Sequence, residues 1–323
     1  MADKIVLENT KCKLCGSKTP AHFLDCMDFQ HGVEGKFTLV KCSKCGLVYQ
    51  NPRPSEKTLA LAYPLEYQPY SNFIRRKPEG WKFGLRKKLL GCFYNYPFKF
   101  GFQWKIILFP LYALQKLKKS KILPFCGKGR LLEIGCGTGE QLLSLQDLGW
   151  KAKGIEFSKD AAETGKRNGA DITVGRIEDT QLKEKFDVVL MIYVFEHLSE
   201  PGITLDKIRK ILDKNGRLVL DIPNIDSFES AIFKEKWFPL EMPRHFYQFS
   251  PATIRQMLEM HGFEVESILH DPTSKRFLQS LNYVLGTKGL EHNKFLSMLL
   301  FPLTYKFAFL GKGPIIRVTA KIM

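Results

Sequence analysis

The sequence of 323 residues contains no apolar run long enough to cross a membrane. Its longest nearly uncharged stretch, Phe295–Leu310, has 16 residues, is interrupted by Lys306 and contains Pro302, whereas a membrane-spanning helix needs about 20 apolar residues. The apolar stretch Ile5–Leu7 near the N-terminus is also far too short for the core of a signal peptide. We therefore expect a cytoplasmic protein.

Acidic residues are scarce in the first third of the chain. Residues 1–120 contain 8 acidic and 21 basic side chains, and residues 121–323 contain 25 and 28, so the first third carries +13 of the net charge of +16. Residues 73–120 alone carry +11, from 12 basic side chains against the single acid Glu79. A segment with this charge should face an anionic partner: a membrane surface, a nucleic acid or a phosphorylated substrate.

Internal repeats and low-complexity segments are also absent, and 44% of the residues are apolar, which is enough for a core. Three regions differ in pattern. Residues 1–55 contain paired cysteines among turn residues, and residues 56–125 are basic and aromatic, as expected for a helical linker, a lid or a membrane-facing segment. From residue 126 to residue 323, short β-type runs alternate with helical patterns, which predicts an α/β domain with a mainly parallel sheet.

Seven strands are expected in this third region. Six helical or loop segments separate them, and the last two strands are separated by an insertion at about 270–314 that contains apolar helical elements. The expected strands are residues 130–134, 152–156, 171–174, 186–191, 217–222, 263–269 and 315–322.

Four of the eight cysteines form two C-x2-C pairs, Cys12 with Cys15 and Cys42 with Cys45, and a glycine follows each pair. Two such pairs offer four thiolates for tetrahedral zinc, with the intervening residues folded as a ribbon. Four thiolates leave no open coordination position, so this zinc is expected to be structural. Two redox dithiols or four unliganded thiols are the alternatives.

Three glycines, Gly135, Gly137 and Gly139, lie directly between the first expected strand of the α/β region and a helix. Glycines at this position allow a tight turn and let a ligand lie against the backbone at the helix N-terminus. The spacing G-x-G-x-G differs from the dinucleotide fingerprint G-x-G-x-x-G, and other nucleotide-binding folds can use it. Glu156 ends the second strand, where an acid can accept both hydroxyls of a ribose.

Residues 132–139, 154–158, 186–189 and 196–198 closely resemble, in this order, the class I S-adenosylmethionine-dependent methyltransferases. The resemblance implies a Rossmann-like seven-stranded sheet, last strand antiparallel, with S-adenosylmethionine across the carboxyl ends of the strands. It also implies a set of cofactor-binding residues: Glu133, Gly135, Cys136, Gly137, Thr138 and Gly139 at the methionine part, Glu156 at the ribose, and Phe157, Ile177 and Glu178 around the adenine. Arg176 departs from the family pattern, because many relatives have an acid there.

Two histidines are candidate catalytic residues. His197 follows the fourth strand of the sheet, and His245 lies in the sequence Pro243-Arg244-His245. A lone histidine is more often structural, but residues 222–227 and Trp237-Phe238 complete a pattern that resembles a subgroup associated with surface-polysaccharide and glycolipid biosynthesis. In that subgroup the Pro-Arg-His loop covers the acceptor pocket, so we expect His245 to be the base and His197 an orienting or structural residue.

The ubiquinone-pathway O-methyltransferases are similar to this chain after the fourth strand, where two glutamates and a histidine can bind a divalent ion. Here Glu196 and His197 are present, but Tyr193 replaces the first glutamate. We therefore predict no catalytic magnesium.

Twelve aromatic residues accompany the twelve basic residues of 73–120, and the insertion contains the apolar run Phe295–Phe301. This composition is typical of an interfacial membrane element, and also of single-stranded RNA binding or of a lid with a solvated basic face. The two apolar elements together favour contact with the inner face of an anionic membrane, through residues 73–120 and 295–310.

These observations predict an S-adenosylmethionine-dependent methyltransferase that methylates a hydroxyl of a sugar or lipid-linked small molecule. One alternative is an RNA methyltransferase of the rRNA type, whose zinc module binds RNA. Another is a non-catalytic zinc-ribbon adaptor with a degenerate methyltransferase fold, which the intact glycine loop and Glu156 disfavour.

Overall fold

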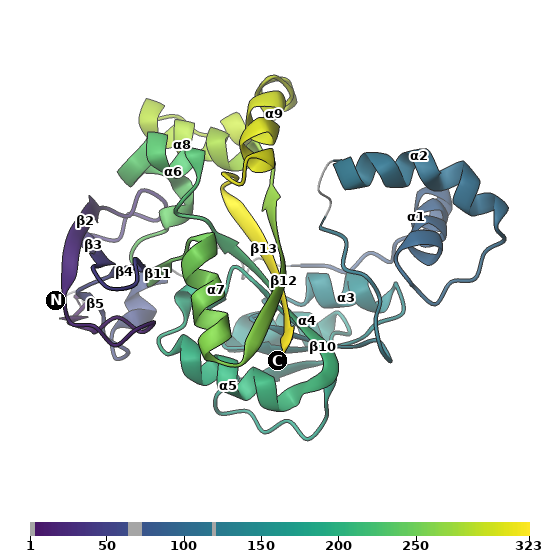
Figure 1. Ribbon diagram of the computed structural model, residues 1–323, viewed down its shortest axis with the longest axis horizontal. Coiled ribbons are helices and arrows are strands. Elements are labelled where there is room, and N and C mark those ends of the chain that lie inside the picture. Colours follow the sequence, from purple (N-terminus) through teal and green to yellow (C-terminus); the bar gives the residue numbers. More distant parts are fainter. Residues whose placement is uncertain (1–3, 64–72, 118–120) are drawn as a thin grey trace.

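The computed structural model describes residues 4–63, 73–117 and 121–323. A seven-stranded sheet forms its centre, in the order β12-β13-β10-β9-β6-β7-β8 (Figure 1). The strands are β6 (Arg130–Ile134), β7 (Lys151–Glu156), β8 (Ile172–Val174), β9 (Phe186–Ile192), β10 (Leu212–Pro223), β12 (Phe263–Asp271) and β13 (Ile315–Ile322).

Five strands of this sheet, β8, β7, β6, β9 and β10, run parallel to one another, and β13 is antiparallel to both β10 and β12. The prediction of a Rossmann-like α/β sheet with an antiparallel last strand is therefore confirmed. The parallel arrangement brings the carboxyl ends of the strands to one edge, where ligands bind in open α/β sheets.

The sheet has an apolar core on each face. In β9, Val189 and Met191 belong to one core and Val188 and Leu190 to the other, because successive side chains of a strand point to opposite faces. The first core is covered by α5 (Pro201–Ile211) and α7 (Pro251–Met260), and the second by α3 (Glu140–Gln146) and α4 (Lys159–Arg167). The nearly continuous apolar run of β9, which only Asp187 interrupts, follows from burial on both sides.

The N-terminal region forms a four-stranded antiparallel sheet in the order β11-β4-β3-β2. Its first three strands in sequence are β2 (Pro20–Cys26), β3 (Phe37–Cys42) and β4 (Val48–Gln50), and β1 (Leu7–Glu8) pairs separately with β5 (Arg53–Pro54). The fourth strand, β11 (Tyr247–Gln248), comes from the α/β region and pairs Tyr247 with Tyr49. We call residues 4–55 the ribbon.

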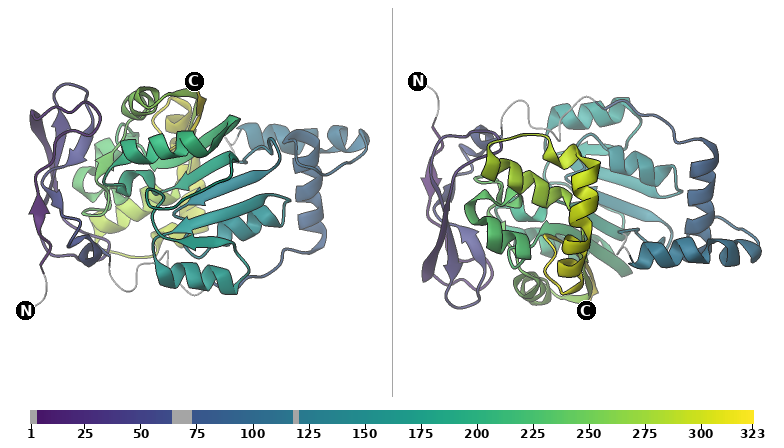
Figure 2. Two further views of the ribbon diagram at one scale, coloured as in Figure 1. Left: turned by 90° about the horizontal axis from the view of Figure 1, so that it is seen from below. Right: turned by 90° about the horizontal axis from the view of Figure 1, so that it is seen from above.

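Two helices, α1 (Gly80–Phe93) and α2 (Gln103–Leu117), form an arm at the opposite end of the molecule from the ribbon (Figures 1 and 2). We call residues 80–117 the arm. Its inner side chains Leu89, Leu90, Tyr94 and Tyr96 are buried in the second core, together with Trp150. Residues 64–72 and 118–120 of the predicted basic aromatic region lie outside the described residues.

The insertion between β12 and β13 contains α8 (Lys275–Leu285) and α9 (Lys294–Phe309), and α6 (Phe228–Phe233) packs against α8. Within the described ranges, no helix combines the length and the apolarity that crossing a bilayer requires.

Candidate active site

The glycine loop connects β6 to α3 at the carboxyl edge of the sheet. Gly135, Gly137 and Gly139 all have positive φ, at 69°, 55° and 71°, which glycine adopts without steric cost. A Cβ at Gly135 would clash with Val194, and one at Gly139 would lie 2.8 Å from Ala170 Cβ. Backbone groups therefore line this loop, as close approach of a ligand requires.

Cys136 and Thr138 alternate with these glycines and are buried. The sulfur of Cys136 lies toward β7, because a Cβ added to Gly154 would clash with it. The backbone of Cys136, rather than its thiol, is thus the part of this residue that a ligand in the loop can reach.

Two buried carboxyl groups stand beside the loop. Glu156 ends β7 and accepts hydrogen bonds from the Gly137 amide at 2.8 Å and from the Ser158 amide at 2.7 Å. Glu133 Oε2 is buried and has no hydrogen-bond partner among the described residues. Burial and the neighbouring Glu156 raise the pKa of Glu133 to about 8, and burial also raises the pKa of Glu156. A positively charged ligand would stabilise the ionised form of both groups.

The residues predicted to surround the adenine differ in exposure. The Phe157 ring is 65% exposed, and the Arg176 guanidinium lies over it at 5.6 Å from the ring centre. Arg176 is also 3.7 Å from a Glu56 carboxylate oxygen. Ile177 is buried in the first core, and the Glu178 carboxylate accepts a hydrogen bond from Thr204 of α5. Only Phe157 and Arg176 of this group present exposed side chains.

The two candidate histidines lie together, although 48 positions separate them in the sequence. His197 belongs to the short helix Phe195–His197 that follows β9, and His245 to the loop before β11. Their ring centres are 4.4 Å apart and the rings meet edge to face at 87°. The loop after β9 also reaches the cofactor side, because Val194 packs against Gly135.

His245 is held in one tautomer. Its Nδ1 is 2.9 Å from the Pro239 carbonyl oxygen, so Nδ1 carries the proton and Nε2 has the lone pair. Nε2 is 3.5 Å from Glu241 Oε2 and 3.9 Å from Glu196 Oε1. Burial and the nearby His197 lower the pKa of His245 to about 3, and burial raises the pKa of Glu196 well above its ordinary value.

His197 is oriented by a similar bond. Its Nδ1 is 3.1 Å from the Arg244 carbonyl oxygen and 3.2 Å from the Tyr63 hydroxyl. Ligand atoms of Glu196, His197 and His245 all lie within 4.8 Å of one another, so these three side chains could hold a divalent ion. Both imidazoles donate Nδ1–H to a backbone carbonyl, which is the usual support of a ligating histidine.

A buried ion pair that the sequence analysis missed fixes the loop of His245. The Arg244 guanidinium donates to both carboxylate oxygens of Asp28, at 2.8 and 3.0 Å, and both side chains are fully buried. Burial by itself would raise the pKa of Asp28, but Arg244 holds it below its ordinary value. Asp28 lies in the ribbon, 216 positions before Arg244, and no local sequence signal connects the two.

The four cysteine thiols of the two C-x2-C pairs come together in the ribbon. The sulfur of Cys12 is 3.5 Å from that of Cys45, and Cys15 is 3.5 Å from Cys42. All four sulfurs lie within 4.8 Å of one another. Tetrahedral zinc with bonds of about 2.3 Å places its sulfurs about 3.8 Å apart, so the four thiols have the spacing that zinc needs.

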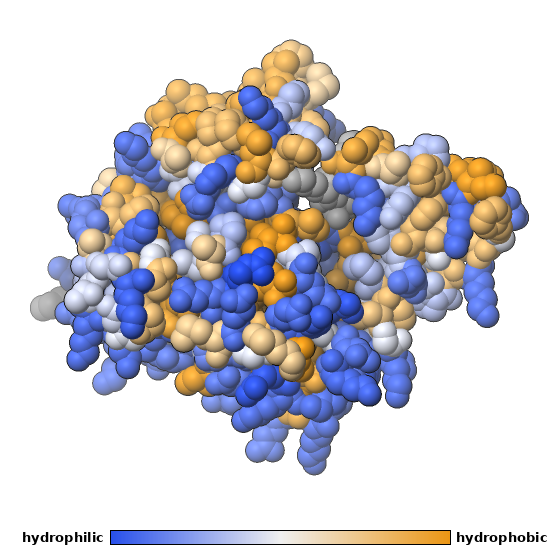
Figure 3. Space-filling view, in the orientation of Figure 1, coloured by the Kyte–Doolittle hydropathy of each residue, from blue (hydrophilic) through white to orange (hydrophobic). Residues whose placement is uncertain are grey.

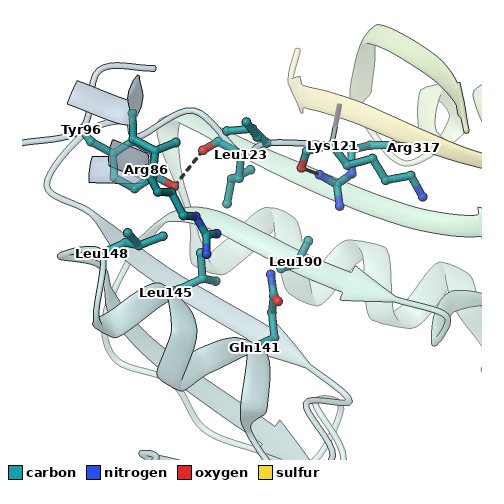
Figure 4. A pocket seen from close by; sticks show the side chains of 11 residues that line it. Arg86, Tyr96, Lys121, Leu123, Gln141, Leu145, Leu148, Leu190 and Arg317 are labelled. Carbon is teal, nitrogen blue, oxygen red and sulfur yellow. Dashed lines mark hydrogen bonds between the residues drawn. The ribbon is translucent and has the colours of Figure 1, made fainter. Parts of the chain in front are cut away.

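A cavity of about 260 Å³ lies between the arm, α3 and the end of β9 (Figure 4). Its walls are mainly apolar, and Arg86 reaches from α1 toward Leu145 of α3. Two further cations at the cavity, Lys121 and Arg317, are both paired with Asp221. No local sequence signal marks this cavity, because its lining comes from distant segments. The lining residues are Arg86, Leu90, Tyr96, Lys121, Ile122, Leu123, Gln141, Leu145, Leu148, Leu190 and Arg317.

Residues 107–268 match a family model described as a methyltransferase domain. The chain belongs to this methyltransferase family. Its relatives include an uncharacterized protein of Methanocaldococcus jannaschii, which is 28% identical over 138 residues, or 42% of this chain and 65% of that protein's own length. A ubiquinone biosynthesis O-methyltransferase of Rhodopseudomonas palustris is 27% identical over 195 residues, covering 54% of this chain and 76% of that one.

The mitochondrial ubiquinone biosynthesis O-methyltransferase of Schizosaccharomyces pombe is 33% identical over 179 residues, covering 52% of this chain and 60% of the yeast protein. Among solved structures, an S-adenosylmethionine-dependent methyltransferase of Thermotoga maritima, described as a possible histamine N-methyltransferase, has a TM-score of 0.44 and 20% identity over 72% of this chain and 99% of that chain. The family, together with the ubiquinone-pathway relatives, supports an S-adenosylmethionine-dependent methyltransferase.

Proposed function

We propose that this methyltransferase transfers a methyl group from S-adenosylmethionine to a hydroxyl of a sugar or lipid-linked small molecule. The observation that carries the proposal is the position of His245 Nε2. This atom has a lone pair and lies in a buried cluster with Glu196 and His197. The amide of the neighbouring His197 donates a hydrogen bond to the Val194 carbonyl, and Val194 contacts Gly135 of the glycine loop.

The residues of the glycine loop fit the cofactor. Gly135 and Gly137 are partly exposed, Glu156 offers a carboxylate for the ribose, and the Glu133 oxygen that has no partner among the described residues favours a positive charge nearby. When bound, S-adenosylmethionine supplies an electrophilic methyl group on a positively charged sulfur. Phe157, with its exposed ring, is the proposed contact for adenine.

The chain's own part in the reaction is to orient the acceptor hydroxyl and to take up its proton. Burial and His197 lower the pKa of His245 to about 3, so its Nε2 is unprotonated at physiological pH. Glu241, whose Oε2 lies 3.5 Å from Nε2, acts in the opposite direction on this pKa and stabilises the imidazolium that forms, and the Pro239 carbonyl fixes the tautomer.

The proposed acceptor class draws support from the cavity beneath the arm. Its apolar walls and the Arg86 side chain suit a molecule that joins a hydrocarbon part to an anionic group. The Pro-Arg-His loop adds the resemblance to enzymes of surface-polysaccharide and glycolipid biosynthesis. A lipid-linked acceptor also agrees with a location on the inner face of a membrane.

We further propose that the ribbon holds a structural Zn(Cys)4 centre, since the four sulfurs have a suitable spacing. The alternative, an RNA methyltransferase with a zinc module for RNA binding, draws support from the basic arm. The ribbon, however, uses Asp28 and β4 to hold the loop of His245, and this internal role favours the small-molecule function.

Mass spectrometry of lipid and glycan extracts, prepared with and without the active protein, would identify the acceptor by a gain of one methyl group. His245→Ala should then abolish most turnover while calorimetry shows unchanged cofactor binding. His292→Ala, which changes an exposed histidine, is the matched control and should retain full activity. Full turnover by His245→Ala would show that His245 is not the base.

A further inference from the structure

Large apolar side chains are exposed on two helices that are far apart in the sequence. On α2 they include Ile106, Ile107 and Phe109, and on α9 they include Met298 and Leu299, each between 57% and 65% exposed. The space-filling view shows apolar side chains gathered over α9 and along α2 (Figure 3). Soluble domains rarely expose this many large apolar side chains together without a partner.

The two helices belong to one surface. Both lie uncovered on the face seen from above in the right panel of Figure 2. The Tyr305 hydroxyl of α9 donates a hydrogen bond of 2.7 Å to the Leu117 carbonyl at the end of α2. We call the exposed side chains of α2 and α9 the apolar face.

The charge around the apolar face has one sign. Residues 80–117 contain seven basic and no acidic residues, and residues 294–312 contain three lysines and no acid. Lysines of the arm also lie on aromatic rings, with Lys88 Nζ 3.4 Å from the centre of the Trp104 ring and Lys87 Nζ 4.6 Å from that of Phe83. A surface of this kind presents apolar side chains beside cations, which complements anionic headgroups over hydrocarbon.

Helix length and side-chain type decide how such a surface meets its partner. The helices α2 and α9 have 15 and 16 residues and each contains a proline, Pro110 and Pro302. At about 1.5 Å per residue they are shorter than the hydrocarbon core of about 30 Å. Seven of the eleven large apolar side chains exposed on α2 and α9 are aliphatic and offer no ring on which a base can stack. The other four are phenylalanines, which also enter a lipid interface, so a lipid surface fits better than RNA.

From these observations we infer that the apolar face docks the chain on the surface of an anionic bilayer, with α2 and α9 lying in the headgroup region. The cations of the arm contact the headgroups, and the apolar side chains enter the boundary of the hydrocarbon. This inference does not depend on methyl transfer, because it concerns only how the surface is covered.

Sedimentation of the full chain with vesicles tests this inference. Vesicles of phosphatidylcholine with about 30% of the anionic lipid phosphatidylglycerol should bind the protein. Vesicles of phosphatidylcholine alone should bind it far less. The double variant Ile107→Asp, Met298→Asp should bind the anionic vesicles about tenfold or more weakly, because it lacks two apolar side chains that the bilayer would bury. Ile203→Asp, which changes an exposed isoleucine of α5, should leave binding to the anionic vesicles unchanged.

Circular dichroism of each variant verifies that it is folded. Equal binding of the double variant and the wild type to anionic vesicles would overturn the inference. Binding of the protein to a labelled RNA oligonucleotide but not to vesicles would also overturn it. The third contrary outcome is a wild-type dimer in sedimentation velocity that is monomeric in the double variant, with neither form binding vesicles.

Discussion

The ribbon and the arm occupy opposite ends of the molecule and are attached to the central sheet in different ways (Figure 2). The ribbon shares a strand with the α/β region and is joined to it by the buried pair of Asp28 and Arg244. The arm rests on the second core through Leu89 and Leu90, and its outer side remains apolar and exposed. The ribbon also contributes Leu14 and Leu47 to the first core, so a shared strand and a buried ion pair add to its apolar packing, whereas the arm is held mainly by apolar packing.

Loss of the proposed zinc should have the largest effect, and it should unfold the ribbon while leaving the arm folded. Cys45→Ser removes one of four proposed zinc ligands, and metal binding at such sites contributes on the order of 10 kcal/mol to folding of the module. We expect loss of zinc by elemental analysis, unfolding of the ribbon, and loss of activity through the loop of His245. The half-buried Cys92 of the arm provides the control, and Cys92→Ser should keep both zinc and fold.

If Cys45→Ser were as stable as Cys92→Ser and the purified protein held no zinc, the four thiols would have no metal role. If the variant remained active although its ribbon was unfolded, the proposed link between the ribbon and His245 would be contradicted.

Breaking the buried ion pair should have the next largest effect. Asp28→Ala removes the bidentate carboxylate partner of the buried Arg244 guanidinium and leaves the Nε bond to Glu241 at 3.3 Å, which costs about 3–5 kcal/mol. The exposed pair of Lys312 and Asp226, at 2.9 Å, is the matched comparison, and Asp226→Ala should change the free energy of unfolding by about 1 kcal/mol or less. Urea denaturation followed by circular dichroism measures both. Similar losses in the two variants would show that the Asp28 pair does not anchor the loop.

The same pair predicts a pH dependence of stability. Because Arg244 holds the pKa of Asp28 below its ordinary value, this carboxylate contributes stability that is present above the pKa of the unfolded chain and is lost as the pH falls through the folded pKa. The free energy of unfolding should therefore decrease less on acidification in Asp28→Asn than in the wild type. The arm contains no acidic residue, so its packing should not contribute to this difference.

A smaller effect is expected where the arm rests on the sheet. Leu90 is buried in the second core, and Leu90→Ala should cost about 2–4 kcal/mol. Ile107→Ala, on the exposed side of the same arm, should stay within about 0.5 kcal/mol of the wild type. Urea denaturation of the two variants checks this contrast. Equal values would mean that the arm packs loosely on both sides.

Much of the central fold could be predicted from the sequence because its signals are local. Each strand of the α/β sheet lies close to an expected apolar run, and Ser250 caps α7 with a reciprocal hydrogen bond to Thr253, as the order Ser-Pro predicts. The glycine loop was also visible, because the residues that form it are consecutive.

The contacts between distant segments could not be predicted in this way. The strand β11 has only two residues, too few for a periodic pattern, and Asp28 gives no sign that its partner is Arg244. Composition marked the arm as basic and aromatic but did not show that Tyr94 and Tyr96 face the core while Ile106 faces outward. Which side of a helix is covered depends on tertiary packing, and a single sequence does not record it.

The strand that completes the ribbon sheet lies almost 200 positions after the strand it joins, since Tyr247 pairs with Tyr49. During synthesis, the N-terminal module therefore leaves the ribosome before the chain contains its last strand. The edge of β4 stays open until the α/β region has been made, and an open edge can pair with other chains. In this protein the ribbon is translated before the α/β region, but its sheet can be completed only after β11 has been made.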